Sequence, residues 1–289
     1  MKPLRSFAAF LLLLLGSSAV FAQARQWLKS TKVAEGVWRI DDNASDNMYL
    51  VVGSRKALLI DTGVGVADVA ALVKTLTHKP LLVVNTHGHP DHAGGNFQFK
   101  TVYADAADFD LIRQITPGQA RKFFPNLAND KNAYSDLVPA QQTTPATKLI
   151  PVKDGFRFDL GGRTIEVIQT PGHTPGEIVL LDAANKLVFT GDNDNSLVWL
   201  FLTHSLPLEK YLESLRKLNA RSDQFSTIYP GHGPPLPETF VAEQISCVEG
   251  ILDGSLPSEA YHSFVGDARV SKFKDAQVAF NPENLRTKQ

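Results

Sequence analysis

Residues 85–95 read Asn-Thr-His-Gly-His-Pro-Asp-His-Ala-Gly-Gly, directly after the apolar run Leu81–Val84. Side chains of the types that bind metals fall at four of six consecutive positions, His87, His89, Asp91 and His92. In an extended segment, His87 and His89 project to the same side and can share one ion. Proline bends the chain after them, so Asp91 and His92 can be carried towards a second ion. The spacing therefore predicts two neighbouring metal sites.

Three later turns each follow a predicted strand and each carry one more side chain of this kind. His173 lies in a Gly/Pro turn after residues 164–169, and Asp192 and His232 follow residues 187–190 and 227–229. In α/β sheets, sites collect at the carboxyl ends of strands. Imidazole and carboxylate ligands suit zinc and tolerate manganese or iron. These turns favour a metal site over the alternative of a solvated polar loop.

The hydrophobic pattern around these turns mixes strands and helices along the whole chain. Period-two or apolar runs predict strands, and apolar residues at helical spacing predict helices. The strands are expected at 37–40, 48–52, 57–60, 81–84, around Tyr103, and at 156–160, 164–169, 178–181, 187–190 and 227–229, and the helices at 66–76, 106–115, 208–218 and 240–251. Residues 116–146 are rich in proline and polar side chains and predict an irregular insertion or lid. No linker interrupts the pattern, which favours an α/β fold in layers and one domain.

Composition excludes some functions. The chain has 289 residues, 29 Lys and Arg against 30 Asp and Glu, and a net charge of −1. Such a chain has no basic field to hold a phosphate backbone, so we expect no nucleic-acid partner. Cys247 is the single cysteine, so no intrachain disulfide can form, and its helical apolar surroundings predict a buried small side chain.

The first 22 residues differ from the rest of the chain. A short basic start is followed by an apolar run at residues 7–15 and by small residues before Gln23. This is typical of a cleaved secretory signal. The alternative, a membrane anchor, needs about 20 apolar residues, more than this stretch provides. We therefore expect a mature domain of residues 23–289, periplasmic or secreted, with no membrane span.

The ligand-type residues together resemble a known family. His87-x-His89-x-Asp91-His92 followed by His173, Asp192 and His232, with Asp61-Thr62-Gly63 upstream, is similar to the metallo-β-lactamase superfamily of dinuclear metallohydrolases. The resemblance implies a four-layer αββα sandwich of α/β (α+β) class with the metals at one edge of two facing sheets. It also implies two ligand sets, His87, His89 and His173 for one ion and Asp91, His92 and His232 for the other. Asp192 would bridge the ions, and Asp61 would fix a ligand histidine.

This resemblance implies a mechanism. Two zinc ions, or manganese or iron in their place, would share a water and lower its pKa towards 7. The resulting bridging hydroxide, kept oriented by Asp91, would attack the carbonyl of a small-molecule ester, lactone, lactam or amide. Three alternatives stay open: a β-lactamase proper, an iron-dependent persulfide dioxygenase-like enzyme, and a non-catalytic binding protein stabilised by its metals.

Differences from the better-known enzymes of this family narrow the set of enzymes that the chain resembles. β-Lactamases with three zinc-bound histidines at one site usually have Cys or Ser where this chain has Asp192. An aspartate there is more similar to glyoxalase II, lactonases and related esterases. Residues 233–237, however, do not resemble the start of the glyoxalase II tail, and export argues against a glutathione thioester as substrate.

Residues 193–204 follow the expected bridging aspartate and should lie near the cleft. Trp199 and His204 are therefore candidates for the substrate pocket, with packing under the next helix as the alternative for the aromatic residues Trp199 and Phe201. His78 and His262 lie in polar stretches and are expected at the surface. The substrate and the oligomeric state are not predicted, because they depend on loops such as residues 41–47 and 116–146.

Overall fold

The computed structural model describes residues 25–117, 119, 122, 134–138 and 146–288. The strands are β1 (Leu28–Ala34), β2 (Val37–Asp42), β3 (Asn47–Val52), β4 (Ala57–Ile60), β5 (Leu81–Val84), β6 (Thr101–Asp105), β7 (Lys148–Val152), β8 (Arg157–Asp159), β9 (Thr164–Gln169), β10 (Ile178–Asp182), β11 (Leu187–Gly191), β12 (Leu197–Leu200), β13 (Thr227–Pro230), β14 (Leu236–Pro237), β15 (Glu259–Ser263), β16 (Gly266–Phe273) and β17 (Ala276–Phe280). The α-helices are α1 (Val69–Leu76), α2 (Pro90–Ala93), α3 (Phe109–Gln114), α5 (Leu208–Asn219) and α6 (Phe240–Asp253).

Two sheets form the centre of the molecule. One has the order β1-β2-β3-β4-β5-β6-β7 and the other β14-β13-β11-β10-β9-β8. β4 and β5 run parallel in the first sheet, and β11 and β13 run parallel in the second. Because parallel strands end at the same edge of a sheet, the loops that leave these strands gather there.

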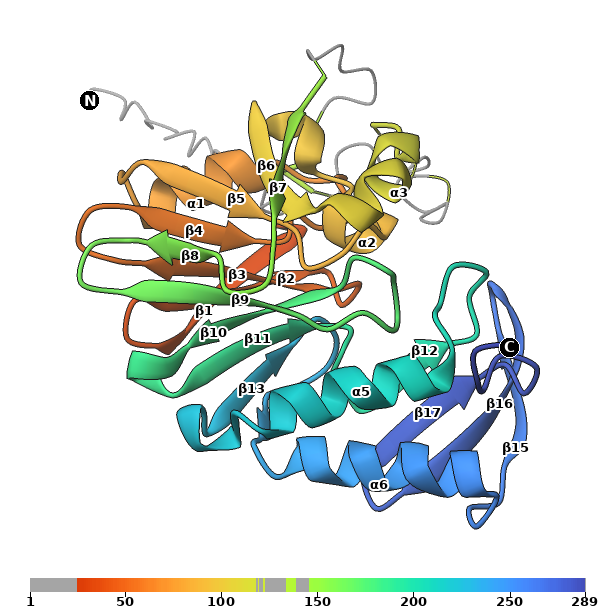
Figure 1. Ribbon diagram of the computed structural model, residues 1–289. Helices are drawn as coiled ribbons and strands as arrows, with labels where there is room; N and C mark the ends of the chain where they lie inside the picture. The colour runs from red at the N-terminus through yellow and green to blue at the C-terminus, as the bar shows by residue number, and fades with distance from the viewer. Residues whose placement is uncertain (1–24, 118, 120–121, 123–133, 139–145, 289) are drawn as a thin grey trace, which may run out of the picture.

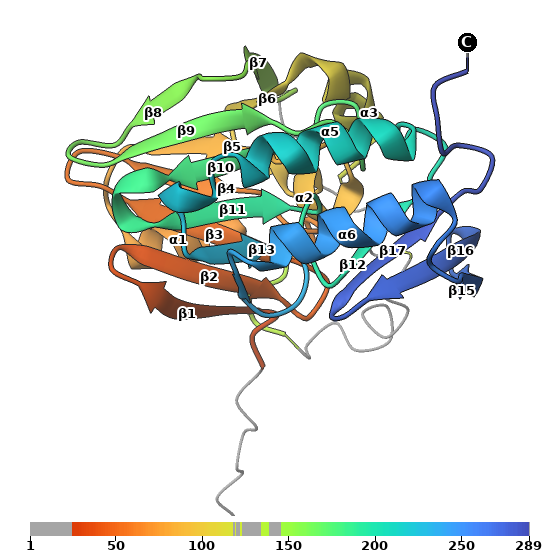
Figure 2. The ribbon, with the colours of Figure 1, turned by 60° about the horizontal axis from the view of Figure 1, so that its bottom comes forward.

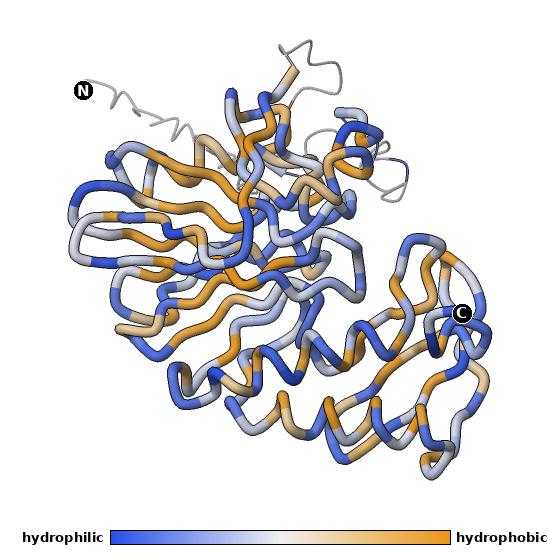
Figure 3. The backbone as a smooth tube through the Cα atoms, viewed as in Figure 1, coloured by the Kyte–Doolittle hydropathy of each residue, from blue (hydrophilic) through white to orange (hydrophobic). Residues whose placement is uncertain are grey.

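The two sheets pack face to face through alternating apolar residues. The inward side chains of β3 and β4, such as Tyr49 and Leu58, meet Leu180 and Phe189 of the other sheet in one buried cluster. Figure 3 shows hydrophobic residues concentrated along these strands. Each Å² of apolar surface that this interface removes from water stabilises the fold by about 25 cal/mol.

Helices cover both outer faces of the sheet pair. Val69 and Val73 of α1 pack against the outer side of the first sheet. Leu215 of α5 and Val248 of α6 pack against the outer side of the second, where the two helices lie side by side (Figures 1 and 2). The order helix, sheet, sheet, helix confirms the predicted four-layer αββα sandwich.

A third sheet, not predicted from the sequence, lies towards the carboxyl end. Its order is β12-β17-β16-β15, and it packs against α6 (Figure 1). β12 pairs in parallel with β17, so Trp199 lies opposite Ala279. Residues far apart in the sequence therefore make one surface beside the sandwich.

Most predicted elements are confirmed with small changes at their ends. α1 begins at Val69 rather than at residue 66, because the Asp68 carboxylate caps it by accepting a hydrogen bond from the Ala71 N–H. The helix expected at 106–115 is divided into a 3₁₀ turn, Ala106–Asp108, and α3. The edge strands β1 and β7 were missed, because their side chains are mostly polar or partly exposed.

Some expectations fall where the structure is not described. The signal peptide at residues 1–22 and most of the insertion at 116–146 lie outside the described residues. The single domain over residues 23–289 stays a prediction. No helix in the described part of the chain is long and apolar enough to cross a membrane. Cys247 is buried in α6, as expected, and His78 and His262 are exposed.

Candidate metal centre

Five strand ends supply the site. β4 leads to Asp61, β5 to the loop that carries His87 and His89, and β9, β11 and β13 lead to His173, Asp192 and His232. Every ligand-type residue expected from the sequence lies at this edge of the sheet pair, in three overlapping sets of mutually close ligand atoms.

His87, His89 and His173 form the first ligand group. Their ligand atoms lie within 4.8 Å of one another. Nδ1 of His89 is 3.0 Å from Nε2 of His87 and 2.8 Å from Nε2 of His173. Burial, together with neighbouring imidazoles, holds the pKa of His87 and of His89 well below the usual range. Neutral imidazole is the form that binds metals, so this group is already in its ligating state.

Asp91, His92 and His232 form the second ligand group, whose ligand atoms are also within 4.8 Å of one another. Nε2 of His92 is 3.3 Å from Nε2 of His232, which is 3.5 Å from Oδ2 of Asp91. Burial opposes the charged form of both histidines, but the surrounding carboxylates outweigh it. They raise the pKa of His92 to about 9 and hold that of His232 well above its usual range. The carboxylates of the second group therefore favour a positive charge beside them, which protonated histidines supply.

Asp192 lies between the two groups. Its Oδ2 is 3.5 Å from His173 Nε2, in the first group. Its Oδ1 is 3.5 Å from His92 Nε2 and 3.3 Å from His232 Nε2, in the second. The same Oδ1 is buried without a hydrogen-bond partner. A buried carboxylate oxygen without a partner is costly, and a cation would remove that cost, so the geometry fits two bound ions with Asp192 facing both.

Close approach of the backbone is needed at one turn. A Cβ at Gly231 would lie 2.7 Å from Asp192 Oδ1 and 2.7 Å from His92 Cε1. Only glycine lets the turn after β13 bring His232 this near to the bridging carboxylate.

Asp61 supports the second group through its contact with His92. It accepts hydrogen bonds from the Thr86 N–H and hydroxyl, both at 2.8 Å, and lies 3.0 Å from Nδ1 of His92. This contact fixes the His92 ring so that Nε2 faces the site, the arrangement typical of carboxylates behind metal-binding histidines. Asp61 adopts φ of 63° to do so, a region that few non-glycine residues occupy.

Two carboxyl groups that support the site, those of Asp108 and Glu177, were not predicted from the sequence. Asp108 is fully buried; its Oδ2 accepts from the Gly88 N–H at 2.8 Å and the Thr174 hydroxyl at 2.6 Å, and its Oδ1 from the Gly176 N–H at 2.7 Å. It therefore clamps together the two loops that carry the first group. A helix was predicted around it, and nothing local distinguishes it from a solvated helix residue.

Glu177 is the second missed group. It is buried, accepts a hydrogen bond from the Asp192 N–H at 3.1 Å, and its other oxygen lies 3.7 Å from Nδ1 of His87. Burial raises the pKa of this carboxyl well above its usual range. The one available signal was its place directly after the turn that carries His173.

Both candidates for the substrate pocket lie against the first group. The Trp199 carbonyl accepts a hydrogen bond from Nδ1 of His173 at 2.6 Å. Nε2 of His204 contacts Nε2 of His89, the nitrogen that faces away from the other two ligands. Trp199 and Phe201 contact each other and Tyr261 of the third sheet.

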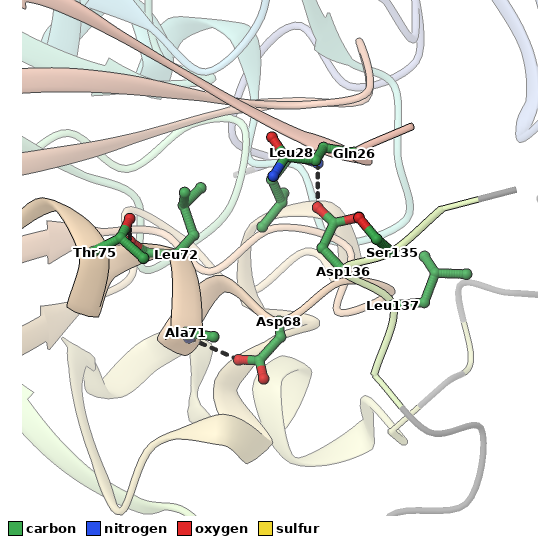
Figure 4. A pocket seen from close by; sticks show the side chains of 9 residues that line it. All are labelled: Gln26, Leu28, Asp68, Ala71, Leu72, Thr75, Ser135, Asp136 and Leu137. Atoms are coloured by element: carbon green, nitrogen blue, oxygen red, sulfur yellow. Dashed lines mark hydrogen bonds between the residues drawn. The ribbon is translucent and has the colours of Figure 1, made fainter. Parts of the chain in front are cut away.

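A separate cavity of about 370 Å³ lies between β1, α1 and residues 135–137 (Figure 4). Its two carboxylates are already engaged: Asp68 caps α1, and Asp136 accepts the backbone N–H groups of Trp27 and Leu28. None of its lining residues belongs to the ligand groups, so we assign it no chemical role.

Comparison with known proteins identifies the family of the chain. The family model described as the metallo-beta-lactamase superfamily matches residues 43–232. The acyl-coenzyme A thioesterase MBLAC2 of Homo sapiens is 28% identical over 263 residues, covering 77% of this chain and 85% of that protein. An atrochrysone carboxyl ACP thioesterase of Aspergillus fumigatus is 29% identical over 199 residues, covering 65% of this chain and 37% of that protein. Among solved structures, TTHA1623 in a di-iron-bound form has a TM-score of 0.50 and 25% identity, covering 69% of this chain and 93% of that one.

Proposed function

The chain belongs to the metallo-β-lactamase superfamily, and from that premise we propose that this metal-dependent hydrolase cleaves an acyl thioester or ester with two divalent ions. The observation that carries the proposal is Asp192, whose two carboxylate oxygens face different ligand groups. The first ion would be held by His87, His89 and His173, and the second by Asp91, His92 and His232, with Asp192 shared.

Such ions supply two things when bound: they polarise a carbonyl and lower the pKa of a water that they share. The residues of the chain do the rest. Asp91 is partly exposed, with 37% of its side chain open to solvent, so it can accept a hydrogen bond from the attacking water and orient it. Asp61 and Asp108 keep the ligand side chains and loops in place.

The substrate class rests on two kinds of support. A thioester carbonyl calls for the same attack by water as the ester, lactone, lactam or amide that the sequence pattern indicates. The two relatives compared above are named as thioesterases for acyl-coenzyme A and for an acyl carrier protein. Both names specify an acyl group joined through sulfur, which makes a thioester the first substrate to test.

Two finer points belong to the same proposal. We propose zinc as the metal, because the five histidines and two carboxylates of the ligand groups suit it, although a structural relative holds iron. We propose export to the periplasm or beyond, because residues 1–22 have the composition of a secretory signal. Sequencing the amino terminus of the protein recovered from outside the cytosol would show cleavage before Gln23 if the signal is processed there.

The function is tested by hydrolysis with the purified mature protein. The panel contains acyl thioesters, a p-nitrophenyl ester, a lactone and the β-lactam nitrocefin, each with metal-loaded and chelated protein. We expect thioester turnover that chelation abolishes and zinc restores, with two metal ions per chain. Absence of turnover on every substrate, or one iron per chain with oxygen uptake on a persulfide, would overturn the proposal in favour of other chemistry.

A further inference from the structure

Four aromatic side chains gather where the third sheet adjoins the metal centre; we call them the aromatic group. They are Trp199 of β12, Phe201 just after it, Tyr261 of β15 and Phe264 in the turn between β15 and β16. The ring centroid of Trp199 is 5.3 Å from that of Phe201, 6.2 Å from that of Tyr261 and 5.9 Å from that of Phe264. Such distances are typical of rings in contact.

Part of this group is open to solvent. Phe264 is 81% exposed and the adjacent Val265 is 49% exposed. Among the described residues, the other exposed large hydrophobic side chain is Phe156, at 38%, which directly precedes β8 at the edge of the second sheet. Neighbouring apolar side chains left in water on a folded protein mark a surface that binds something apolar.

The aromatic group is joined to the first ligand group through one strand. On β12, Val198 and Leu200 point into the core, so Trp199 points to the opposite face of the sheet. The backbone carbonyl of the same Trp199 accepts the hydrogen bond from His173 Nδ1. Five residues later, His204 contacts His89. A substrate carbonyl at the metal centre would therefore have this surface beside it.

The chemistry of the surface is apolar. The indole N–H of Trp199 donates to the Tyr261 hydroxyl at 3.0 Å, so the polar atoms of these two rings are directed at each other. On the same hairpin, His262 Nδ1 and Asp267 Oδ1 lie 2.8 Å apart, and Arg269 donates a hydrogen bond to the Ser258 hydroxyl at 3.1 Å. A phosphate or carboxylate would find no cation within the aromatic group, whereas a hydrocarbon chain would find ring faces.

We propose that the aromatic group binds the hydrocarbon part of the acyl substrate, so that it selects long or bulky acyl groups over acetyl. The inference rests on the proposed function, since it places the acyl carbonyl at the two ligand groups. Each methylene that leaves water strengthens binding by about fourfold, which is the factor that 0.8 kcal/mol represents. A surface of this kind therefore produces a dependence on chain length.

The first test compares acyl chains of different length. Thioesters of N-acetylcysteamine with acetyl, butyryl, hexanoyl, octanoyl and decanoyl groups are hydrolysed by wild type, Phe264→Ala and Phe156→Ala. We expect wild-type kcat/KM to rise with chain length, and the decanoyl-to-acetyl ratio to fall about tenfold in Phe264→Ala but not in Phe156→Ala. A ratio within twofold of wild type in Phe264→Ala would overturn the inference, as would an equal fall in Phe156→Ala.

A second measurement separates failure of the subsite from failure of the function. The thioether S-decyl-N-acetylcysteamine cannot be hydrolysed, and its binding is followed by the change in tryptophan fluorescence. We expect wild type to bind it at least tenfold more tightly than Phe264→Ala. Binding without any hydrolysis would refute the proposed function and leave the subsite standing. Hydrolysis with no dependence on chain length and no binding of the thioether would refute the subsite and leave the proposed function standing.

Discussion

The two ligand groups differ in the charge that the protein gives their histidines. In the first group, burial lowers the pKa of all three imidazoles, so they are neutral donors before any ion arrives. In the second, Asp91, Asp192 and Asp61 raise the pKa of His92 to about 9, so protons occupy the place that an ion would take. An ion entering the second group must therefore displace protons, whereas one entering the first need not.

The largest effects should follow from removing a ligand. We expect His87→Ala and Asp192→Ala each to lower kcat/KM by at least about a thousandfold, because a bound ion contributes several kcal/mol to the transition state. The metal content of the two variants distinguishes a ligand of one group from a ligand shared by both. His87→Ala should lose one ion, and Asp192→Ala, which faces both groups, should lose affinity for both.

Kinetics and elemental analysis of the purified variants check this expectation. His78→Ala is the matched control, since this histidine is exposed and lies outside both groups. Full activity in His87→Ala would show that the first group does not hold a catalytic ion.

The residues of the two ligand groups and the supporting Asp61 were predicted from the sequence, whereas Asp108 and Glu177 were not, for a physical reason. His87, His173 and His232 each lie in a Gly/Pro turn directly after a buried strand, so a short window of sequence identifies them. Asp108 acts through Gly88 and Gly176, which are 20 and 68 residues away. Only the folded chain brings such partners together.

The same contrast holds for the fold. The inner strands of the two central sheets were predicted closely, because they are rich in apolar residues, as Leu81–Val84 shows, whereas edge strands such as β1 were missed. The third sheet depends on β12 pairing with β17, and on the hairpin β15–β16, whose exposed polar residues weaken the pattern. The residues that could set specificity thus lie where local sequence is least informative.

The second prediction concerns the clamp on the first group. Asp108→Ala leaves the N–H groups of Gly88 and Gly176 without their acceptor, and a buried unpaired N–H costs about 1–3 kcal/mol. The loops that carry His87 and His173 should then lose their relative position. We expect a loss of about 10- to 100-fold in affinity for the first ion, the usual range for residues that support metal ligands.

Metal titration against a competing chelator would measure this loss separately for each ion. Asp110→Ala is the control, because Asp110 is exposed on α3 and pairs only with the exposed Arg113 among the contacts described for it. Equal weakening of both ions in Asp108→Ala would mean that the clamp supports the whole site rather than its first group.

The third prediction concerns His204 as a positioning residue. It contacts Nε2 of His89, which leaves Nδ1 of His89 facing His87 and His173. Removal in His204→Ala should lower first-ion affinity by about tenfold, the lower end of the range for supporting residues. His204→Gln keeps an acceptor for the His89 N–H and should restore most of the affinity. If alanine and glutamine behave alike, orientation of His89 is not the role of His204.

The smallest effects should appear in metal-free protein, where the histidine pKa values of the two groups are shifted in opposite directions. The pKa of His92 is raised from 6.5 to about 9, so folding is favoured by its proton. That stability is fully present below about pH 6.5, the unfolded value, and is lost as the pH rises through about 9. The pKa of His173 is lowered by burial, so its neutral form costs stability as the pH falls below about 6.5, where the unfolded chain takes up the proton.

Melting temperatures of the chelated protein between pH 5 and 10 would separate these contributions. The advantage of wild type over His92→Gln should fade on the alkaline side, and the penalty relative to His173→Gln should grow on the acid side. In metal-loaded protein both slopes should flatten, because bound ions hold all these imidazoles deprotonated. Parallel curves for the two variants would mean that the groups carry the same charge, and the order in which ions load would then have to come from geometry alone.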